Sequence, residues 1–138
     1  MIDRVEIQVH SHATEDVEKV KEAVRKLLGV EQIEFTELKA RGHHGNPIIT
    51  LIATLKGKEA ERAVRNLLSK MDEFDFEIMV RELDIRSEKS KLYLRFDKQK
   101  AYLGKTEMSS GSDVIRVVIV FKGRKVSEDL LRELRGSE

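Results

Sequence analysis

The sequence of 138 residues contains no cysteine, which excludes disulfide bonds, thiol nucleophiles and thiolate metal sites. Only 5% of the residues are aromatic, so a hydrophobic core must be built from aliphatic side chains. No apolar run approaches the ~20 residues that a membrane-spanning helix requires. Charges interrupt the apolar residues near the N-terminus, unlike in a signal peptide. These absences predict a cytoplasmic protein that has no membrane segment.

The hydrophobic and charged fractions are both high, at 40% and 37% of the chain. A chain of this length can bury roughly two-thirds of the surface that it exposes when unfolded, so we expect one domain over residues 1–138. Glu, Lys and Arg are abundant, whereas Asn and Gln are scarce. This composition is typical of proteins from hyperthermophiles, in which networks of ion pairs contribute to stability.

Positive and negative charges are separated along the chain. The net charge is only +1, which argues against a uniformly basic nucleic-acid-binding protein. Residues 39–71 and 86–105 nevertheless each contain seven basic and two acidic residues, whereas residues 72–85 contain one basic and six acidic residues. The two basic segments are either solvated faces of separate elements or parts of one anion-binding surface.

Apolar residues recur with the periods of strands and helices. Strands are predicted at residues 4–12, 33–41, 48–56, 91–97, 101–108 and 114–122. Helices are predicted from the cap Thr14 to the stop Gly29, at residues 58–71 and 72–84, and from the cap Ser127 through Arg135. Segment 72–84 also alternates like a strand, but Asp72 is a suitable cap and favours a helix. In 33–41 the alternation breaks phase, which predicts either a β-bulge near Glu37 or a departure of the segment from the sheet edge.

The resulting order of elements is β-α-β-β-α-α-β-β-β-α. Some strands are sequential neighbours and others are separated by helices, which indicates an α+β fold. We expect a single domain with a mixed or antiparallel sheet, helices packed on one face and the other face partly open. Strands 33–41 and 48–56 should form a hairpin around a turn at 42–47. Strand 114–122, or another edge strand, could pair with a partner or a second copy of the chain.

All four histidines lie in two pairs. His10 and His12 are two residues apart on one predicted strand, and His43 and His44 lie in the predicted hairpin turn. If the pairs meet in space, they could bind zinc or nickel. No carboxylate stands at a diagnostic spacing beside them, so we interpret them as exposed imidazoles and predict no metal or other cofactor.

The sequence also lacks signatures of catalysis. The glycine-containing turn at 42–47 does not have the Lys-Ser/Thr ending of a phosphate-binding loop. No serine lies in a Gly-x-Ser-x-Gly motif. Asp97 adjoins several cations, and we interpret it as an ion-pairing residue. We therefore expect a protein that is not an enzyme.

Residues 92–104 combine a strand-like alternation with cations and rings. Leu92 and its alternate neighbours should point inward, whereas Tyr93 and Arg95 should point outward. A polar bend at 98–100 is expected before the chain becomes extended again. Cations attract phosphates, and aromatic rings can stack on unpaired bases for roughly 1–3 kcal/mol each. The predicted RNA-contacting residues are Lys39, Arg41, His43, His44, Arg95, Lys98, Lys100, Tyr102 and Lys105.

Four segments of the chain are distinctive. They read Ser-His-Ala-Thr-Glu-Asp at 11–16, Gly-Asn-Pro-Ile at 45–48, Leu-Tyr-Leu-Arg-Phe-Asp-Lys-Gln-Lys-Ala-Tyr-Leu-Gly at 92–104 and Asp-Val-Ile-Arg-Val at 113–117. Together they resemble an archaeal family of predicted RNA-binding proteins, also described as predicted exosome subunits. The resemblance implies a fold similar to the large-subunit ribosomal protein that contacts 5S rRNA, or a double-stranded-RNA-binding-like fold. It implies no catalytic residues.

The residues and the resemblance together predict an RNA-binding protein of RNA processing or ribosome-related assembly. Its partner would be a structured or ribosomal RNA, and it could associate with the exosome. One alternative is a protein-interaction or assembly module without direct RNA contact, for which a homodimer is one form. A histidine-dependent metal-binding protein is a second alternative. The sequence leaves open whether the RNA is single- or double-stranded.

Overall fold

The computed structural model describes residues 1–42 and 45–136. Its centre is a six-stranded antiparallel sheet with the strand order β2-β3-β1-β6-β5-β4. The strands are β1 (Ile2–His12), β2 (Thr36–Arg41), β3 (Pro47–Lys56), β4 (Ser87–Glu88), β5 (Lys91–Asp97) and β6 (Val114–Phe121). The helices are α1 (Val17–Leu28), α2 (Gly57–Lys70), α3 (Glu73–Arg81), α4 (Leu83–Arg86), α5 (Lys98–Tyr102) and α6 (Glu128–Arg135).

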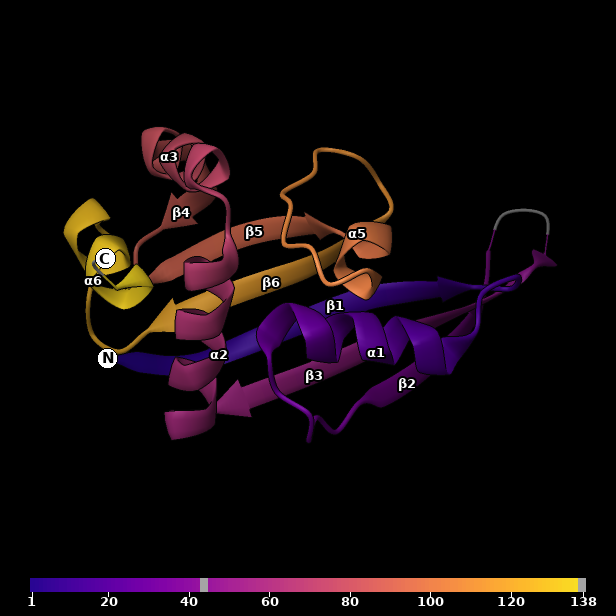
Figure 1. Cartoon of the computed structure of the whole chain (residues 1–138). Coiled ribbons are helices and arrows are strands. Elements are labelled where there is room, and N and C mark those ends of the chain that lie inside the picture. The colour runs from indigo at the N-terminus through magenta and orange to yellow at the C-terminus, as the bar shows by residue number, and fades with distance from the viewer. Residues whose placement is uncertain (43–44, 137–138) are drawn as a thin grey trace.

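The helices cover one face of the sheet (Figure 1). Alternate residues of β1 and β5 point toward the helices and are buried, whereas the residues between them face the other side. The apolar stripes of α1, α2 and α6 complete a mostly aliphatic core, in which Phe96, Leu27 and Leu67 are fully buried. The predicted single-domain α+β fold, with its helices on one face, is confirmed.

The predicted hairpin of β2 and β3 is confirmed, but β2 is shorter than expected and begins at Thr36. Its pairing with β3 is regular over all six residues, so the predicted bulge near Glu37 is wrong. Ile33, whose position broke the alternation, is buried just before the strand. The break in phase therefore marks the start of the strand rather than an irregularity within it.

Helix α1 is capped two residues later than predicted. The side chain of Asp16 accepts a hydrogen bond from the backbone amide of Glu18 at 2.9 Å. Thr14, the predicted cap, lies in the turn between β1 and α1. Gly29 ends the helix as predicted, with a left-handed φ of 65°.

Two further predicted caps are confirmed. At the start of α3, the side chain of Asp72 accepts a hydrogen bond from the Phe74 amide at 2.7 Å. At the start of α6, Ser127 Oγ accepts one from the Leu130 amide at 3.3 Å. The helix predicted across 72–84 is divided into α3 and α4, because the backbone leaves the helical conformation at Glu82.

The segment after β5 departs most from the prediction. The expected polar bend at 98–100 is the helix α5, and the strand predicted at 101–108 is absent from this described segment. Asp97 caps α5, because its side chain accepts a hydrogen bond from the third amide of the helix at 2.8 Å. Lys98 and Ala101 lie three residues apart on one side of α5 and are both buried. In place of the predicted strand, Met108 forms an isolated bridge with Phe96 of β5.

Strand β6 lies in the middle of the sheet, between β1 and β5. The prediction that segment 114–122 offers an edge to a partner is therefore wrong, because both sides of β6 are already paired. One edge of the sheet is β2, whose six residues are all exposed, and the other is β4, which has two residues. Across the described residues, no helix combines the length and the apolar character that crossing a bilayer would need.

Candidate nucleic-acid interface

The predicted RNA-contacting residues do not form one surface. Strand pairing places Lys39 and Arg41 on the same face of the sheet as the helices, near the hairpin turn. Arg95 lies on the opposite face, where it is paired with a residue of β6. His43 and His44 lie outside the described residues. A single contact surface built from all of these residues is therefore not available.

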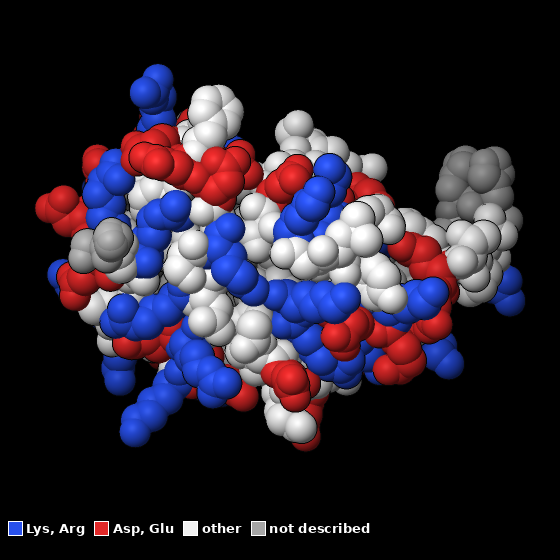
Figure 2. Space-filling model, viewed as in Figure 1, with Lys and Arg blue, Asp and Glu red and all other residues white. Residues whose placement is uncertain are grey.

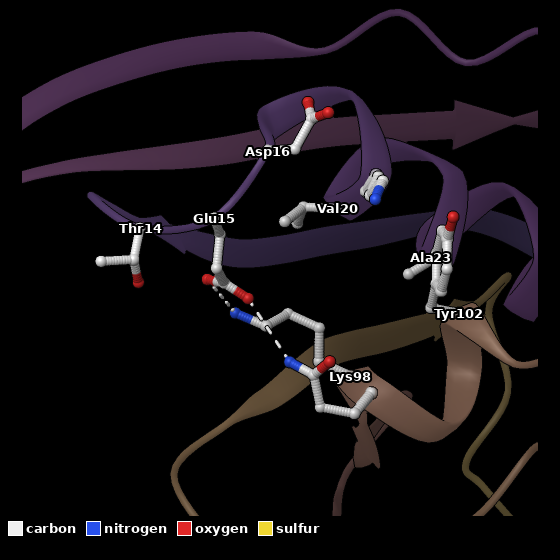
Figure 3. Close-up of a pocket in the computed structure, with 9 residues that line it drawn as sticks. Thr14, Glu15, Asp16, Val20, Ala23, Lys98 and Tyr102 are labelled. Atoms are coloured by element: carbon white, nitrogen blue, oxygen red, sulfur yellow. Dashed lines mark hydrogen bonds and ion pairs between the residues drawn. The ribbon is translucent and has the colours of Figure 1, made fainter.

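Lys98 is buried and fully engaged, with a side chain that is 3% exposed. Its Nζ lies 2.8 Å from Glu15 Oε1, 2.8 Å from Asp113 Oδ1 and 2.8 Å from the His10 carbonyl oxygen, to which it donates a hydrogen bond. Figure 3 shows Lys98 pointing from α5 toward Glu15 in the turn that precedes α1. An ammonium group with three acceptors inside the protein has no donor left for a phosphate. Lys98 is thereby removed from the candidate contact residues.

The cluster around Lys98 instead joins four parts of the chain: β1, the turn before α1, α5 and the loop before β6. Gln99 contributes by donating a hydrogen bond to Asp113 Oδ2 at 3.1 Å. Burial alone would raise the pKa of Glu15, but hydrogen bonds from the His12 amide and from Lys98 lower it overall. Burial opposes the same shift at Asp113, whose pKa is lowered by hydrogen bonds from Lys98 and Gln99. Both carboxylates are therefore held in their charged form.

A cleft of about 390 Å³ lies beside this cluster, between α1 and α5 (Figure 3). Tyr102 lines this cleft, but its ring already contacts a cation, because Lys26 Nζ lies 4.6 Å from the ring centroid. The same Nζ donates a hydrogen bond to the Tyr102 carbonyl oxygen at 2.9 Å. Nζ of Lys100 lies 3.9 Å from Oε1 of Glu107. Lys105, which follows α5, is exposed. These contacts make α5 a connector between the sheet and α1 and leave Tyr102 poorly placed to stack on a base.

The other side of the sheet bears none of the described helices, and we call it the open face. Tyr93 projects from β5 onto this face, with 44% of its surface exposed. Strand pairing places Tyr93 opposite Val118 of β6 and Val118 opposite Glu6 of β1. Glu6 is in turn opposite Thr54 of β3. These four residues form a row across the sheet. The exposed ring of Tyr93 therefore lies at the β5 end of this row.

Two rows of cations flank the row of Tyr93. The first cationic row contains Lys56, Arg4 and Lys91, which strand pairing aligns across β3, β1 and β5, with Val120 of β6 between the last two. The second cationic row contains Arg116 and Arg95, which are directly opposite each other on β6 and β5. Each row lies two residues from that of Tyr93, a separation of about 7 Å at the usual rise of a strand.

Most of these cations lack a carboxylate partner within residues 1–42 and 45–136. Arg4 is the exception, because its Nη1 lies 2.6 Å from Asp3 Oδ2 and its Nε lies 2.7 Å from Glu6 Oε2. The ion pairs that the described residues form include none with the other four members of the two rows. Like charges directly opposite each other in a sheet are destabilising, by roughly 0.2–1 kcal/mol. An anion that bridges Arg95 and Arg116 would relieve this repulsion.

Arg95 and His10 add hydrogen-bonding groups to the open face. Nη2 of Arg95 donates to the Gly111 carbonyl oxygen at 2.9 Å, and its buried Nε has no hydrogen-bond partner among the described residues. His10 Nδ1 lies 2.9 Å from Thr50 Oγ1. Burial, followed by the charge of Arg116, lowers the pKa of His10, so its imidazole is neutral at neutral pH.

The metal site suggested by the histidine pairs gains no support from the described residues. Within residues 1–42 and 45–136, no three His, Cys, Asp or Glu side chains are grouped so that they could hold a metal ion. His10 and His12 project onto the open face, opposite Thr50 and Ile48 of β3. The other pair, at positions 43 and 44, lies outside the described residues.

Sequence reasoning missed four of the five cations in the two rows. Arg4, Lys56, Lys91 and Arg116 each occupy a solvent-facing position in an alternating strand, which is a visible signal. The order of the strands is not visible in this way. β1 lies between β3 and β6, which are distant in sequence, and this order is what aligns the cations around Tyr93.

Comparison with known proteins identifies the family. Residues 4–121, which include all members of the two cationic rows, match a family described as RNA binding. The chain belongs to this family. It is 40% identical to the RNA-binding protein PAB1135 of Pyrococcus abyssi, over 86% of this chain and 80% of that protein. It is 34% identical to the uncharacterized protein MJ0213 of Methanocaldococcus jannaschii, over 100% of this chain and 98% of that protein.

The fold is also similar to that of solved structures. Protein AF2318 of Archaeoglobus fulgidus superimposes with a TM-score of 0.78 and 34% identity, over 97% of this chain and 99% of that one. The relatives named come from archaea. The predicted membership of an archaeal RNA-binding family is thereby confirmed.

Proposed function

We propose that this protein binds RNA through the open face of its sheet, where Tyr93 stacks on an unpaired base. The observation that carries this proposal is an exposed ring between two cationic rows. The ring offers a π-surface to a base, and the cations on either side can bind the flanking phosphates. The family and the printed name of the Pyrococcus abyssi relative support RNA as the ligand. The proposal is one of binding and includes no catalytic step.

The shape of the open face favours RNA bases that are not paired. In an A-form duplex the bases are stacked on one another, and the narrow major groove does not admit side chains. A ring on the surface of a sheet can therefore stack only on a base in a single strand, a loop or a bulge. Gln8, Thr50 and Thr54 lie on the same face and offer hydrogen-bonding groups to the edges of such bases.

Replacing Tyr93 tests the proposal directly. Fluorescence anisotropy would compare the affinity of the wild type and of Tyr93→Ala for an unpaired RNA of about 15 nucleotides and for the corresponding duplex. Loss of one stacked base should weaken binding of the unpaired RNA by roughly 5- to 150-fold. Tyr93→Phe keeps the ring and should retain most of the affinity. Binding of the duplex should be weaker than that of the unpaired strand and should depend little on Tyr93.

Phe74 provides a matched control, because it is also an exposed ring, with 71% of its surface accessible. It lies on α3 between Glu73 and Asp75, where an RNA backbone would be repelled. Phe74→Ala should leave RNA affinity unchanged. The proposal is refuted if Tyr93→Ala binds the unpaired RNA as tightly as the wild type, or if the two variants lose affinity equally.

The wider form of the proposal is a role in RNA processing or ribosome-related assembly in the cytoplasm, including association with an exosome. Its support is the resemblance of segments 11–16, 45–48, 92–104 and 113–117. The tagged protein would be recovered from a native lysate with and without nuclease. Exosome subunits recovered in both cases would support a physical association, and their loss after nuclease would show that RNA carries the link.

The exposed edge of the sheet supports a second candidate function, that of a protein-interaction or assembly module. All six residues of β2 are exposed, and Leu38 has 52% of its surface accessible. An unpaired edge strand can add a strand from a partner or from a second copy. Size-exclusion chromatography of the RNA-free protein would show a concentration-dependent dimer that Leu38→Lys abolishes. A monomer at all concentrations would exclude a homodimer through this edge.

A further inference from the structure

A basic cleft lies at the end of the sheet where β3 passes into α2 and β6 ends. Its volume is about 650 Å³, and its lining includes Gly57, Lys58, Arg62 and Lys122. Figure 2 shows Lys and Arg atoms gathered at this end of the molecule, around the start of α2 and near the N-terminus. The cleft lies outside the two cationic rows, because none of the five cations of those rows lines it.

The cleft contains more cations than acids, and its cations come from α2 and from Lys122, which follows β6. Lys58, Arg62 and Arg65 are spaced four and three residues apart on α2, which places them on one side of that helix. Glu61 also lines the cleft, and it is held by Arg65 at 3.1 Å. Among the ion pairs of the described residues, none involves Lys58, Arg62 or Lys122. Three cations therefore remain free to bind an anion.

The cleft is continuous with the open face. Lys56 belongs to the first cationic row, and two residues later Lys58 lines the cleft. Between them Gly57 has a φ of +61°, a conformation that turns the chain from β3 into α2. On β6, Val120 lies in the first cationic row, and Lys122 follows two residues later. Unpaired cations thus lie on both sides of this end of the sheet, Lys56 in the first cationic row and Lys58 and Lys122 in the cleft.

We propose that this cleft is a second anion-binding subsite, which holds the phosphodiester backbone of the same RNA strand after it leaves the open face at the first cationic row. The inference rests on the proposed function, because the open face supplies the first contact. It adds that the RNA footprint extends around the end of the sheet. A strand long enough to reach the cleft should therefore gain contacts that a short strand cannot make.

The length of the RNA tests this inference. The variant Lys58→Gln/Arg62→Gln/Lys122→Gln would be compared with the wild type on unpaired strands of about 5 and about 15 nucleotides, within the range of sites on single-strand-binding proteins. Each phosphate contact to a single strand contributes about 0.7 to the slope of log affinity against log salt, so three lost contacts should reduce the slope by about 2. Between about 50 and about 200 mM salt, the wild type should then lose roughly 20-fold more affinity for the long strand than the variant does. The short strand should bind both proteins alike.

A charge-matched control is Lys19→Gln/Arg81→Gln/Lys125→Gln, which removes three exposed cations that lie outside the cleft, outside the two rows and outside the RNA-contacting residues predicted from the sequence. It should leave the slope for the long strand at the wild-type value, because it removes no phosphate contact of the cleft. Thermal unfolding would check that each variant is folded, and Arg62→Gln alone, with an expected change of about 0.7 in slope, is the fallback if the triple variant is not.

The outcomes separate the two proposals. A long strand whose affinity and salt slope are unchanged in the triple variant overturns the subsite, as does an equal loss for both strand lengths. In either case Tyr93→Ala would still weaken both strands if the open face binds RNA. If Tyr93→Ala has no effect on either strand, the proposed function fails as well.

Discussion

Replacing Lys98 by methionine separates the structural role of this residue from the RNA contact predicted from the sequence. Methionine keeps the unbranched stem and removes the ammonium group. The carboxylates of Glu15 and Asp113 and the carbonyl oxygen of His10 would each lose a donor at 2.8 Å. The substitution should therefore destabilise the protein without changing its affinity for RNA.

The expected loss of stability depends on how far the two carboxylate partners are exposed to water. Breaking a fully buried ion pair costs about 3–5 kcal/mol. The side chains of Glu15 and Asp113 are 22% and 47% exposed, so water can hydrate part of each carboxylate once Lys98 is gone. We expect a decrease of about 2–3 kcal/mol in the free energy of unfolding, consistent with the loss of charge-assisted hydrogen bonds. For a chain of this size, the midpoint of thermal unfolding should fall by roughly 6–15 °C.

Urea unfolding followed by circular dichroism would measure this loss, with Lys100→Met as the control. Lys100 is two residues away, 44% exposed and 3.9 Å from Glu107, so its replacement should change the free energy of unfolding by less than about 0.5 kcal/mol. RNA affinity should be the same in Lys98→Met and the wild type under conditions in which both are folded. The reasoning is refuted if Lys98→Met is as stable as Lys100→Met and binds RNA more weakly than the wild type.

Two further predictions concern acid stability and the second cationic row. The pKa values of Glu15 and Asp113 are lowered from 4.5 and 3.8, so their contribution to stability is complete above these values and is lost as the pH falls through the lower folded-state values. Urea unfolding between about pH 7 and about pH 3 should show this loss of stability in the wild type. In Lys98→Met, which lacks the buried ammonium group, the free energy of unfolding should depend less on pH. Arg116→Glu places an acid opposite Arg95, which should raise the free energy of unfolding by about 0.2–1 kcal/mol and weaken RNA binding at least about tenfold. Affinity that is unchanged in this variant would show that the second cationic row is not part of the interface.

Much of the fold could be predicted from local patterns. The alternation in β1, β3 and β5 and the apolar stripes of α1, α2 and α6 each report directly which side of an element is buried. Caps such as Asp72 and Ser127 were visible because a helix start needs an acceptor for its free amides. These signals lie within a few residues of the structure that they specify.

The helix α5 could not be predicted in the same way. Its five residues are too few for a periodic pattern, and three of the first four positions after Asp97 are polar or charged. Polar residues next to a strand indicate a surface bend unless a partner for the charge is known. The partners of Lys98 are 83 and 15 residues away in sequence, at Glu15 and Asp113. They are brought together by the packing of α5 against α1 and by the backbone hydrogen bond that the Lys98 amide donates to the Asp113 carbonyl oxygen.

The candidate interface shows the same dependence on distant pairing. Tyr93 and Arg95 can be assigned to the outer side of a strand from their own segment, but Arg116 becomes their neighbour only because β6 returns between β1 and β5. Directly opposed arginines without a carboxylate partner oppose folding, so they are not explained by the stability of the sheet. Next to an exposed ring, the same arrangement suits a ligand that brings its own negative charge. The unfavourable pair and the favourable ligand site are thus one feature, which is why stability and RNA affinity should change in opposite directions in Arg116→Glu.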